Sequence, residues 1–201
     1  MTSETVSARV EKRTNKRSAA EVDEMFGLGI VDENGIRQVV PQSVSASNST
    51  KIARGRMEAH DVLNEAFHYA KPASFSRGLR IPLGNVDLLL ISGTASVDEQ
   101  GKSIHLGDFR AQCWRTYRNI THLLQGEGAT WQDIVRCSCY LRDIERDYDD
   151  FNEVRAEFFN WLGLDPLPAS TGIQARLCRE DLLVEIEAIA IIPNNRVQNQ
   201  S

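Results

Sequence analysis

Apolar and polar positions in the second half of the chain follow patterns that predict β-strands. Residues 86–91 form an apolar run closed by Ser92-Gly93, which is typical of a buried strand. Residues 134–142 alternate between apolar and polar side chains, as in a strand whose two faces meet different surroundings. Two further strands are predicted over residues 170–176 and 182–192.

Two segments between these strands have the spacing of amphipathic helices. The first follows Asp108, a residue type that caps helix N-termini, and ends near Gly126. The second covers about residues 148–162. The apolar positions that define the two helices are Cys113, Tyr117, Ile120, Leu124, Phe151, Val154, Phe158 and Leu162. This order of elements predicts an α+β domain, a mixed sheet with two helices on one face.

The last predicted strand, residues 182–192, has two different faces. One face is apolar throughout, whereas Glu185 and Glu187 lie on the other, among Leu183, Ile189 and Ile191. A carboxylate in this position either points to solvent or lines a cleft, where burial would raise its pKa and suit it to proton transfer. Since two helices cover only one face of a sheet, the apolar residues of the second face predict a partner copy of the chain.

The N-terminal part of the chain is organised differently. Residues 1–24 and 43–50 are too polar to contribute much to a core. Between them, apolar runs flank Asn34-Gly35, which predicts either a small hairpin or a segment that orders on another surface. We therefore expect a largely flexible extension over residues 1–55, an amphipathic helix or linker over 56–72, a folded domain over 73–193 and a flexible tail over 194–201.

Composition and charge exclude several classes of function. The chain has 201 residues, a net charge of −5 and no Lys/Arg run longer than two, so we expect no nucleic-acid partner. It contains no apolar stretch near the ~20 residues of a membrane span and no apolar N-terminal signal, which predicts a soluble, cytoplasmic protein. Cys113, Cys137, Cys139 and Cys178 form no CxxC pair. They predict reduced, apolar cysteines without metal or cofactor, and a metal or redox role is the alternative.

Three stretches together resemble the reactive-intermediate deaminase family (Rid, YjgF-like). They lie in order within residues 73–192 and read ISGTASVDEQGKSIHLGDFRAQ, GATWQDIVRCSCYLRDIERDYDDFNEVRAEFF and PASTGIQARLCREDLLVEIEAIAII. The resemblance implies a small α+β domain of the chorismate-mutase-like kind, three copies of which form a barrel-like trimer. It also implies ligand clefts between neighbouring subunits, in which family members hydrolyse enamines and imines made by amino-acid-degrading enzymes.

The resemblance also implies roles for particular residues in this cleft. The family glutamate, thought to hold the attacking water, matches Glu185 in VEIEA, and the glycine after the first long strand matches Gly93. An aromatic residue and an asparagine of the second helix match Tyr148 and Asn152. The serine of the usual YSQA segment matches Ser76 in FSRG.

One position departs from the family pattern. Deaminating members carry an arginine fifteen residues before the glutamate, in a P-A-R-S/T context, whereas residues 168–171 of this chain read PAST. A guanidinium forms a bidentate pair with a substrate carboxylate, which the hydroxyl of Ser170 cannot imitate. Arg77 is the candidate replacement, and a surface arginine beside a turn is its alternative. We therefore place Ser170, Thr171 and Arg77 among the substrate-binding residues and expect poor deamination of 2-aminoacrylate-type imino acids.

Three functions remain open from the sequence. The SGTAS motif and the Gly-Asp pair of HLGD also resemble the C-terminal part of chorismatases, which hydrolyse an enol-pyruvyl ether with a glutamate at the matching position. The first alternative is a Rid-like hydrolase of a small imine, enamine or enol metabolite, with Glu185 orienting water. The second is a chorismatase-like hydrolase with Glu185 as general acid, and the third a non-catalytic family member that binds a metabolite or a partner.

Overall fold

The computed structural model of the chain describes Asp32 and residues 52–59, 63–70 and 72–194. The chain divides into two units, residues 1–50 and 51–201, and every described helix and strand belongs to the second. The hairpin predicted at Asn34-Gly35, and with it nearly all of the predicted extension, lies outside the described residues. So does most of the predicted C-terminal tail.

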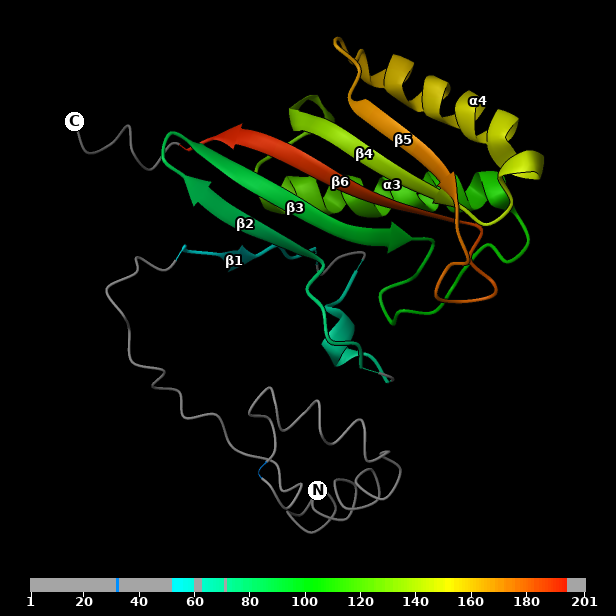
Figure 1. The fold of residues 1–201 in the computed structure, drawn as a ribbon, viewed down its shortest axis with the longest axis horizontal. Helices are drawn as coiled ribbons and strands as arrows, with labels where there is room; N and C mark the ends of the chain where they lie inside the picture. Colours follow the sequence, from blue (N-terminus) through cyan, green and yellow to red (C-terminus); the bar gives the residue numbers. More distant parts are fainter. Residues whose placement is uncertain (1–31, 33–51, 60–62, 71, 195–201) are drawn as a thin grey trace. The chain divides into compact units, whose positions relative to one another are not determined.

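Six strands form one sheet in the order β1-β2-β3-β6-β4-β5 (Figure 1). Neighbouring strands are antiparallel, except for the parallel pair β4 and β5. This arrangement makes the sheet mixed, as predicted, and leaves β1 and β5 at its two edges. The strands are β1 (Gly55–Arg56), β2 (Gly78–Leu83), β3 (Val86–Ala95), β4 (Ile134–Leu141), β5 (Ala169–Gln174) and β6 (Val184–Pro193).

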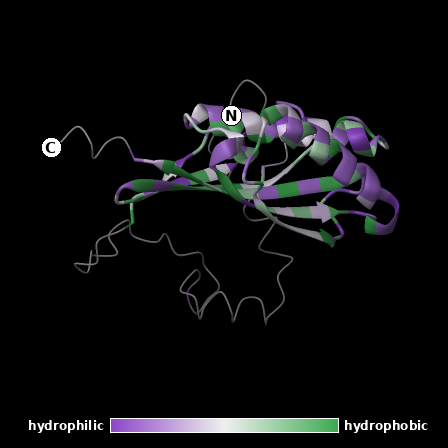
Figure 2. Ribbon diagram, turned by 90° about the horizontal axis from the view of Figure 1, so that it is seen from above, coloured by the Kyte–Doolittle hydropathy of each residue, from purple (hydrophilic) through white to green (hydrophobic). Residues whose placement is uncertain are grey.

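Two α-helices, α3 (Phe109–Gly126) and α4 (Ile144–Leu162), lie on the same side of the sheet (Figure 2). The side chain of Asp108 caps α3 by accepting a hydrogen bond from a backbone N–H of its first turn. Asp143 caps α4 in the same way, and α4 therefore begins before residue 148, where the sequence pattern places its start. Short 3₁₀ helices, η1 (Ala66–His68) and η2 (Trp131–Asp133), complete the elements. The predicted α+β architecture is confirmed.

The β2–β3 hairpin differs from the sequence prediction. Strand β3 does not end at Ser92-Gly93 but continues to Ala95, with an irregular register against β6 between Ile91 and Thr94. Strand β2 was not predicted, and it pairs with β3 through a two-residue turn in which Gly84 has a φ of 71°. The irregularity lets the chain continue as a strand while residues 92 and 93 line a cavity together with Glu185.

The segment over residues 56–72, predicted as an amphipathic helix, forms no α-helix in its described part. Strand β1 pairs with β2, and the backbone N–H of Met57 then donates to the carbonyl of Gly78. Met57, Leu63 and Ala66 are buried, so part of the predicted apolar stripe does pack, from extended chain and the 3₁₀ helix η1 rather than from an α-helix. A short isolated helix is marginal in water, whereas the edge of β2 offers unpaired backbone groups, which favours strand pairing.

The core lies between the helices and the sheet. Strand β6 alternates as predicted: Val184, Ile186, Ala188 and Ala190 are buried on the helix side. Burial also raises the pKa of Cys137 to about 12, and the buried thiols of Cys113 and Cys139 shift in the same direction. The prediction of buried apolar cysteines is wrong for Cys178, which is exposed.

The face of the sheet turned away from the helices is also partly apolar. Ile191 on β6 is 42% exposed and Ile173 on β5 is 45% exposed. All six residues of β5, which forms an edge of the sheet, are exposed. This second face is called the open face below.

Candidate functional site

A cavity of about 580 Å³ opens between the ends of β3 and β6. Its walls come from residues 66–77, from 92–97 at the end of β3, and from 178–187, which lead into and form the start of β6. We call it the Glu185 cavity. Antiparallel pairing of β3 with β6 brings residues about ninety positions apart in the sequence to one place, with Ala95 opposite Glu185.

Gly93 is required by the position of the Glu185 carboxylate. A Cβ atom at position 93 would lie 2.0 Å from Oε1 of Glu185 and 3.0 Å from its Cδ, closer than any real contact. The carboxylate therefore rests directly over the backbone of β3, in space that only glycine leaves free. The two residues that the sequence places together, Gly93 and Glu185, do lie together.

Burial raises the pKa of Glu185 above the ordinary glutamate range. The positive charges of Arg77 and Arg179 lower this pKa, and the negative charge of Glu187 raises it, but desolvation has the largest effect. Glu187 itself accepts a hydrogen bond of 3.0 Å from the hydroxyl of Tyr140. Of the two carboxylates on this face, Glu185 lines the cavity half-buried while Glu187 is exposed at its rim.

Arg77 is a buried cation held in the wall of the Glu185 cavity. Its side chain is only 6% exposed, so it is not the surface arginine that the sequence left as an alternative. Its Nη2 donates to the hydroxyl of Tyr69 at 2.6 Å, and its Nε donates to the carbonyl of Asn64 at 3.2 Å. The guanidinium also lies about 5 Å from the ring centres of Tyr69 and Phe75. These contacts fix the cation near Glu185.

Sequence reasoning missed several residues of this cavity. Tyr69 and Phe75 form an aromatic wall around Arg77, and Cys178 and Arg179 line the side that leads into β6. The aromatic residues are visible in the sequence, but their role depends on an irregular segment that positional patterns do not predict. Arg179 donates to the carbonyl of Gly101 and to the hydroxyl of Ser103, contacts that tie together residues far apart in sequence.

Four predicted site residues lie elsewhere in this chain, on α4 and on the edge strand β5. They are Tyr148, Asn152, Ser170 and Thr171, and we call them the edge cluster. None of them lines the Glu185 cavity of the same chain. Whether they serve a neighbouring subunit, as the family resemblance implies, stays a prediction.

Arg155 organises the edge cluster, and the sequence analysis did not consider it. It projects from α4, where its Nη2 donates to Oδ1 of Asn152 at 2.5 Å and its Nη1 donates to Oγ of Ser170 at 3.3 Å. Ser170 therefore faces the helical layer, and its hydroxyl lies 3.9 Å from the sulfur of Cys139. A guanidinium thus stands beside the serine that replaces the family arginine, but it comes from a helix.

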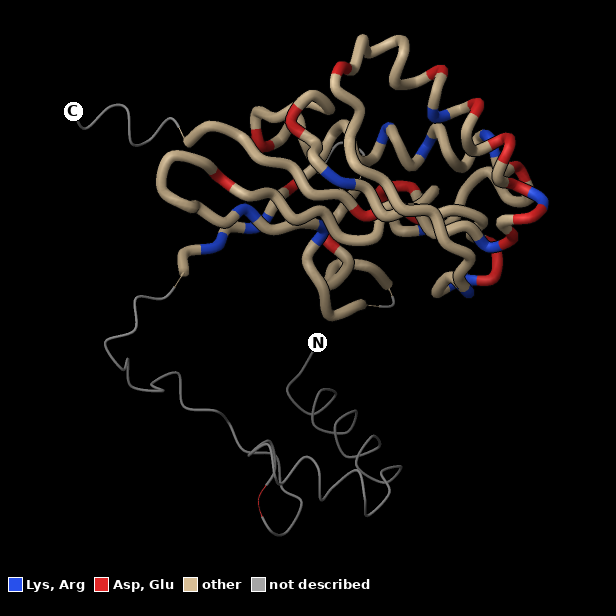
Figure 3. Tube along the Cα trace, turned by 45° about the horizontal axis from the view of Figure 1, so that its top comes forward, with Lys and Arg blue, Asp and Glu red and all other residues tan. Residues whose placement is uncertain are grey.

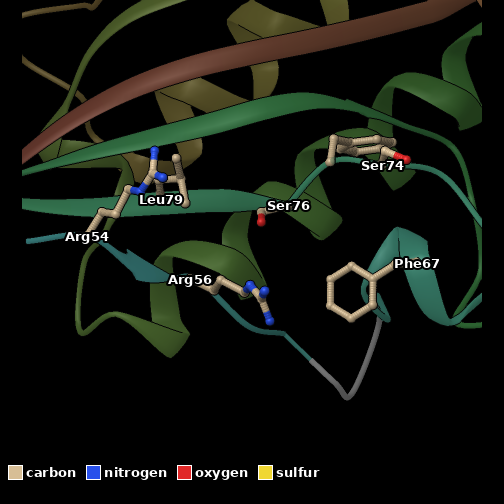
Figure 4. A pocket seen from close by; sticks show the side chains of 7 residues that line it. Arg54, Arg56, Phe67, Ser74, Ser76 and Leu79 are labelled. Atoms are coloured by element: carbon tan, nitrogen blue, oxygen red, sulfur yellow. The ribbon is translucent and has the colours of Figure 1, made fainter. Parts of the chain in front are cut away.

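The last predicted residue, Ser76, lines a second cavity of about 530 Å³, which shares only Phe75 with the Glu185 cavity (Figure 4). Within the described residues, no cluster of His, Cys, Asp or Glu is placed to hold a metal ion. No helix in that part of the chain is both long and apolar enough to cross a membrane.

Comparison with known proteins places the chain in a family. Residues 60–192 match the family model described as Endoribonuclease L-PSP. A RutC family protein of Pyrococcus abyssi is 32% identical over 110 residues, which cover 55% of this chain and 81% of that relative. The 3-aminoacrylate deaminase RutC of Acinetobacter baylyi is 32% identical over 111 residues, 55% of this chain and 84% of the relative.

Solved structures agree with this match at the level of the fold. The YjgF gene product of E. coli superposes with a TM-score of 0.55 at 22% identity, over 68% of this chain and 98% of that one. The resemblance to chorismatases finds no support among these relatives. Since the family model matches well over half of the chain, and the sheet and helices agree with the solved relatives, the chain belongs to the Endoribonuclease L-PSP family, also called the Rid (YjgF) family.

Proposed function

We propose that the protein hydrolyses a small imine or enamine in the Glu185 cavity. The observation that carries this proposal is a half-buried carboxylate of raised pKa, seated over Gly93 and close to the buried cation of Arg77. Perturbed carboxylates in concave sites are typical of proton-transfer chemistry. The deaminase name of the relative from Acinetobacter baylyi supports the same class of reaction.

In the proposed mechanism Glu185 orients a water molecule and accepts one of its protons. The water oxygen forms a bond to the imine carbon, the C=N π pair moves to nitrogen, and the nitrogen takes up a proton from solvent. The resulting carbinolamine then loses its C–N bond: the amine leaves as ammonia with the proton that Glu185 returns, and the C–OH group releases its proton to solvent as the carbonyl forms. The reaction needs no oxidant or reductant. The raised pKa of Glu185 suits a carboxylate that first accepts a proton and then returns it.

Arg77 is the residue that we propose holds the substrate carboxylate. Contacts with Tyr69 and Asn64 engage two of its N–H groups, which leaves others to face the ligand. A fixed cation offsets the repulsion between a substrate carboxylate and Glu185. Because Ser170 replaces the family arginine, we still expect slower deamination of 2-aminoacrylate-type substrates than in relatives that carry that arginine.

We further propose a small metabolite as ligand, a cytoplasmic location and a homotrimer with clefts between subunits. The apolar open face and the fully exposed edge strand β5 favour burial against a second copy, because unpaired strand edges and exposed apolar faces invite association. Acidic positions outnumber basic ones on α4, with six Asp or Glu residues and two Arg residues (Figure 3), which favours a metabolite over a nucleic acid. Light scattering that gives the mass of one chain at micromolar concentration would contradict the trimer.

The experiment that tests the proposed reaction measures ammonia release from imines generated in situ, with and without the protein. Glu185→Gln is expected to lower kcat/KM about 100-fold or more, the usual effect of losing a general base. Glu187→Gln is the matched control, because Glu187 is a glutamate two residues further along β6 with an exposed side chain. This variant should change the rate only slightly.

The melting temperature separates this loss from unfolding. Since ionised Glu185 is partly desolvated, Glu185→Gln should melt no lower than the native protein at neutral pH. The proposal fails if the native protein gives no ammonia above background from any imine or enamine tested while it still binds carboxylates, which is the behaviour of a non-catalytic binding protein.

A further inference from the structure

The second cavity, at the β1–β2 edge of the sheet, has a composition suited to an anion. Its seven lining residues include two arginines, two phenylalanines and two serines, and none of them is acidic. The cavity of about 530 Å³ falls within the range of about 300–1,000 Å³ that small-molecule sites occupy. We call it the Arg54–Arg56 cavity.

Arg54 and Arg56 lack an acidic partner in the described part of the chain. Other arginines of the domain are paired: Arg80 with Asp87, and Arg110 with Asp150. Arg54 and Arg56 take part in no ion pair with a described residue, although both lie within the same short stretch at β1. In Figure 4 the guanidinium of Arg54 lies beside Leu79, whereas that of Arg56 is directed toward Ser76 and Phe67. Among the described residues, the cavity thus holds two cations and no acidic side chain.

The remaining lining residues supply hydroxyl donors and an aromatic surface. In Figure 4 the Arg56 guanidinium and the Ser76 hydroxyl point into the same space, with the Phe67 ring on its far side. The guanidinium carbon of Arg56 lies 5.1 Å from the centre of the Phe67 ring. Within the described residues, neither Ser74 nor Ser76 uses its hydroxyl in a hydrogen bond, so both can donate to a ligand.

We propose that the Arg54–Arg56 cavity binds a small planar anion, a carboxylate or phosphate monoester on an unsaturated or aromatic frame. The anionic group lies between the Arg56 guanidinium and the Ser76 hydroxyl, where charge-assisted hydrogen bonds form, and Arg54 adds positive charge from the other end of the cavity. The planar part packs against Phe67 and Phe75. Because Phe75 also lines the Glu185 cavity, a ligand here contacts the wall of the proposed hydrolytic site without reaching Glu185.

Titration calorimetry of the full chain tests this proposal with three probes: phenyl phosphate, inorganic phosphate and phenol. Phenyl phosphate should bind most tightly, inorganic phosphate more weakly, and phenol least. Arg56→Ser should weaken phenyl phosphate binding about tenfold, the effect of losing one charge-assisted contact, and Arg54→Ser should weaken it less. Arg118→Ser, which removes an exposed arginine from α3, is the control and should leave the affinity unchanged.

Benzoate distinguishes a carboxylate from a phosphate ligand, and tighter binding of either probe identifies the preferred anion. The proposal is overturned if phenol binds as well as phenyl phosphate, or if the double variant Arg54→Ser/Arg56→Ser keeps native affinity. Glu185→Gln should keep the affinity for phenyl phosphate. If Glu185→Gln changes the affinity for phenyl phosphate and the arginine variants do not, the probe occupies the Glu185 cavity. This proposal then fails, while the proposed hydrolysis stands.

Discussion

The Glu185 cavity and the edge cluster are both built on the ends of sheet strands, yet they differ in completeness. In the cavity, one chain supplies a carboxylate, a buried cation and an aromatic wall. In the edge cluster, every residue of β5 is exposed, and the polar side chains contact Arg155, Arg136 and the sulfur of Cys139.

This difference follows from the position of each region in the sheet. The cavity forms where β3 and β6 pair in the middle of the sheet, so strands on both sides fix its geometry. The edge cluster lies on β5, which has a neighbour on one side only. A site in the middle of the sheet has walls from its own chain on several sides, whereas a site at an edge has them on one side only.

The largest effect is expected from adding one methyl group to the cavity. Gly93→Ala would place a Cβ atom 2.0 Å from Oε1 of Glu185 and displace the carboxylate. We expect about a 100-fold loss of imine hydrolysis, because small displacements of a catalytic group cost that much. Gly172→Ala on β5, where a Cβ atom would meet nothing within 4 Å, is the matched control and should keep full activity.

Melting temperatures of the two glycine variants show whether a loss of activity is local or comes from unfolding. Since the obstructing atom is the end of a flexible side chain, Gly93→Ala should stay folded, and its loss of activity is then local. Equal activity of the two variants would contradict the position assigned to Glu185.

A smaller loss of activity is expected from replacing Arg77, with Arg155 as the comparison. Arg77→Gln should lower kcat/KM for a carboxylate-bearing imine by about 30-fold, mostly through KM, because a desolvated charge pair is lost. A neutral imine should be affected much less. Arg155→Gln is the comparison at the edge cluster, where the side chain contacts Asn152 and Ser170 rather than the cavity. Identical losses in both variants, for both substrates, would show that neither arginine holds the carboxylate.

The smallest effect concerns Ser170. Ser170→Arg places a second guanidinium beside Arg155, and like charges at this range cost about 1 kcal/mol in an exposed setting. The melting temperature should fall by about 2–4 °C. Adding Arg155→Gln should restore it, and this double variant should hydrolyse carboxylate-bearing imines faster than the native protein if the edge cluster closes a neighbouring cavity. A melting temperature that rises in the single variant would contradict the contact between Ser170 and Arg155.

Local rules predicted the regular elements well. The alternation of β6 placed Glu185 and Glu187 on the face opposite Val184, and Asp108 predicted the start of α3. Both signals depend on residues close together in sequence. For residues 56–72 the same rules predicted an amphipathic helix or a linker; the described part contains no α-helix, and Arg56 in β1 pairs with Leu79 of β2.

The site was predictable only in part, because some of its contacts join segments that are far apart in the sequence. Family motifs located Glu185 and Gly93, and the structure brings them into contact. The burial of Arg77 depends on Tyr69 and Phe75 closing around it from an irregular segment. The contact of Arg155 with Ser170 depends on how α4 packs against β5. Neither arrangement leaves a periodic signal in the sequence.

The pH dependence of imine hydrolysis tests the central role of Glu185 most directly. Burial raises the pKa of this carboxyl, and only its ionised form accepts a proton from water. The account therefore predicts that kcat/KM rises with pH through an ionisation above the ordinary glutamate value of about 4.3, and that Glu185→Gln removes this limb together with most of the activity. A rate that is independent of pH across this range, or a native profile in Glu185→Gln, would contradict it.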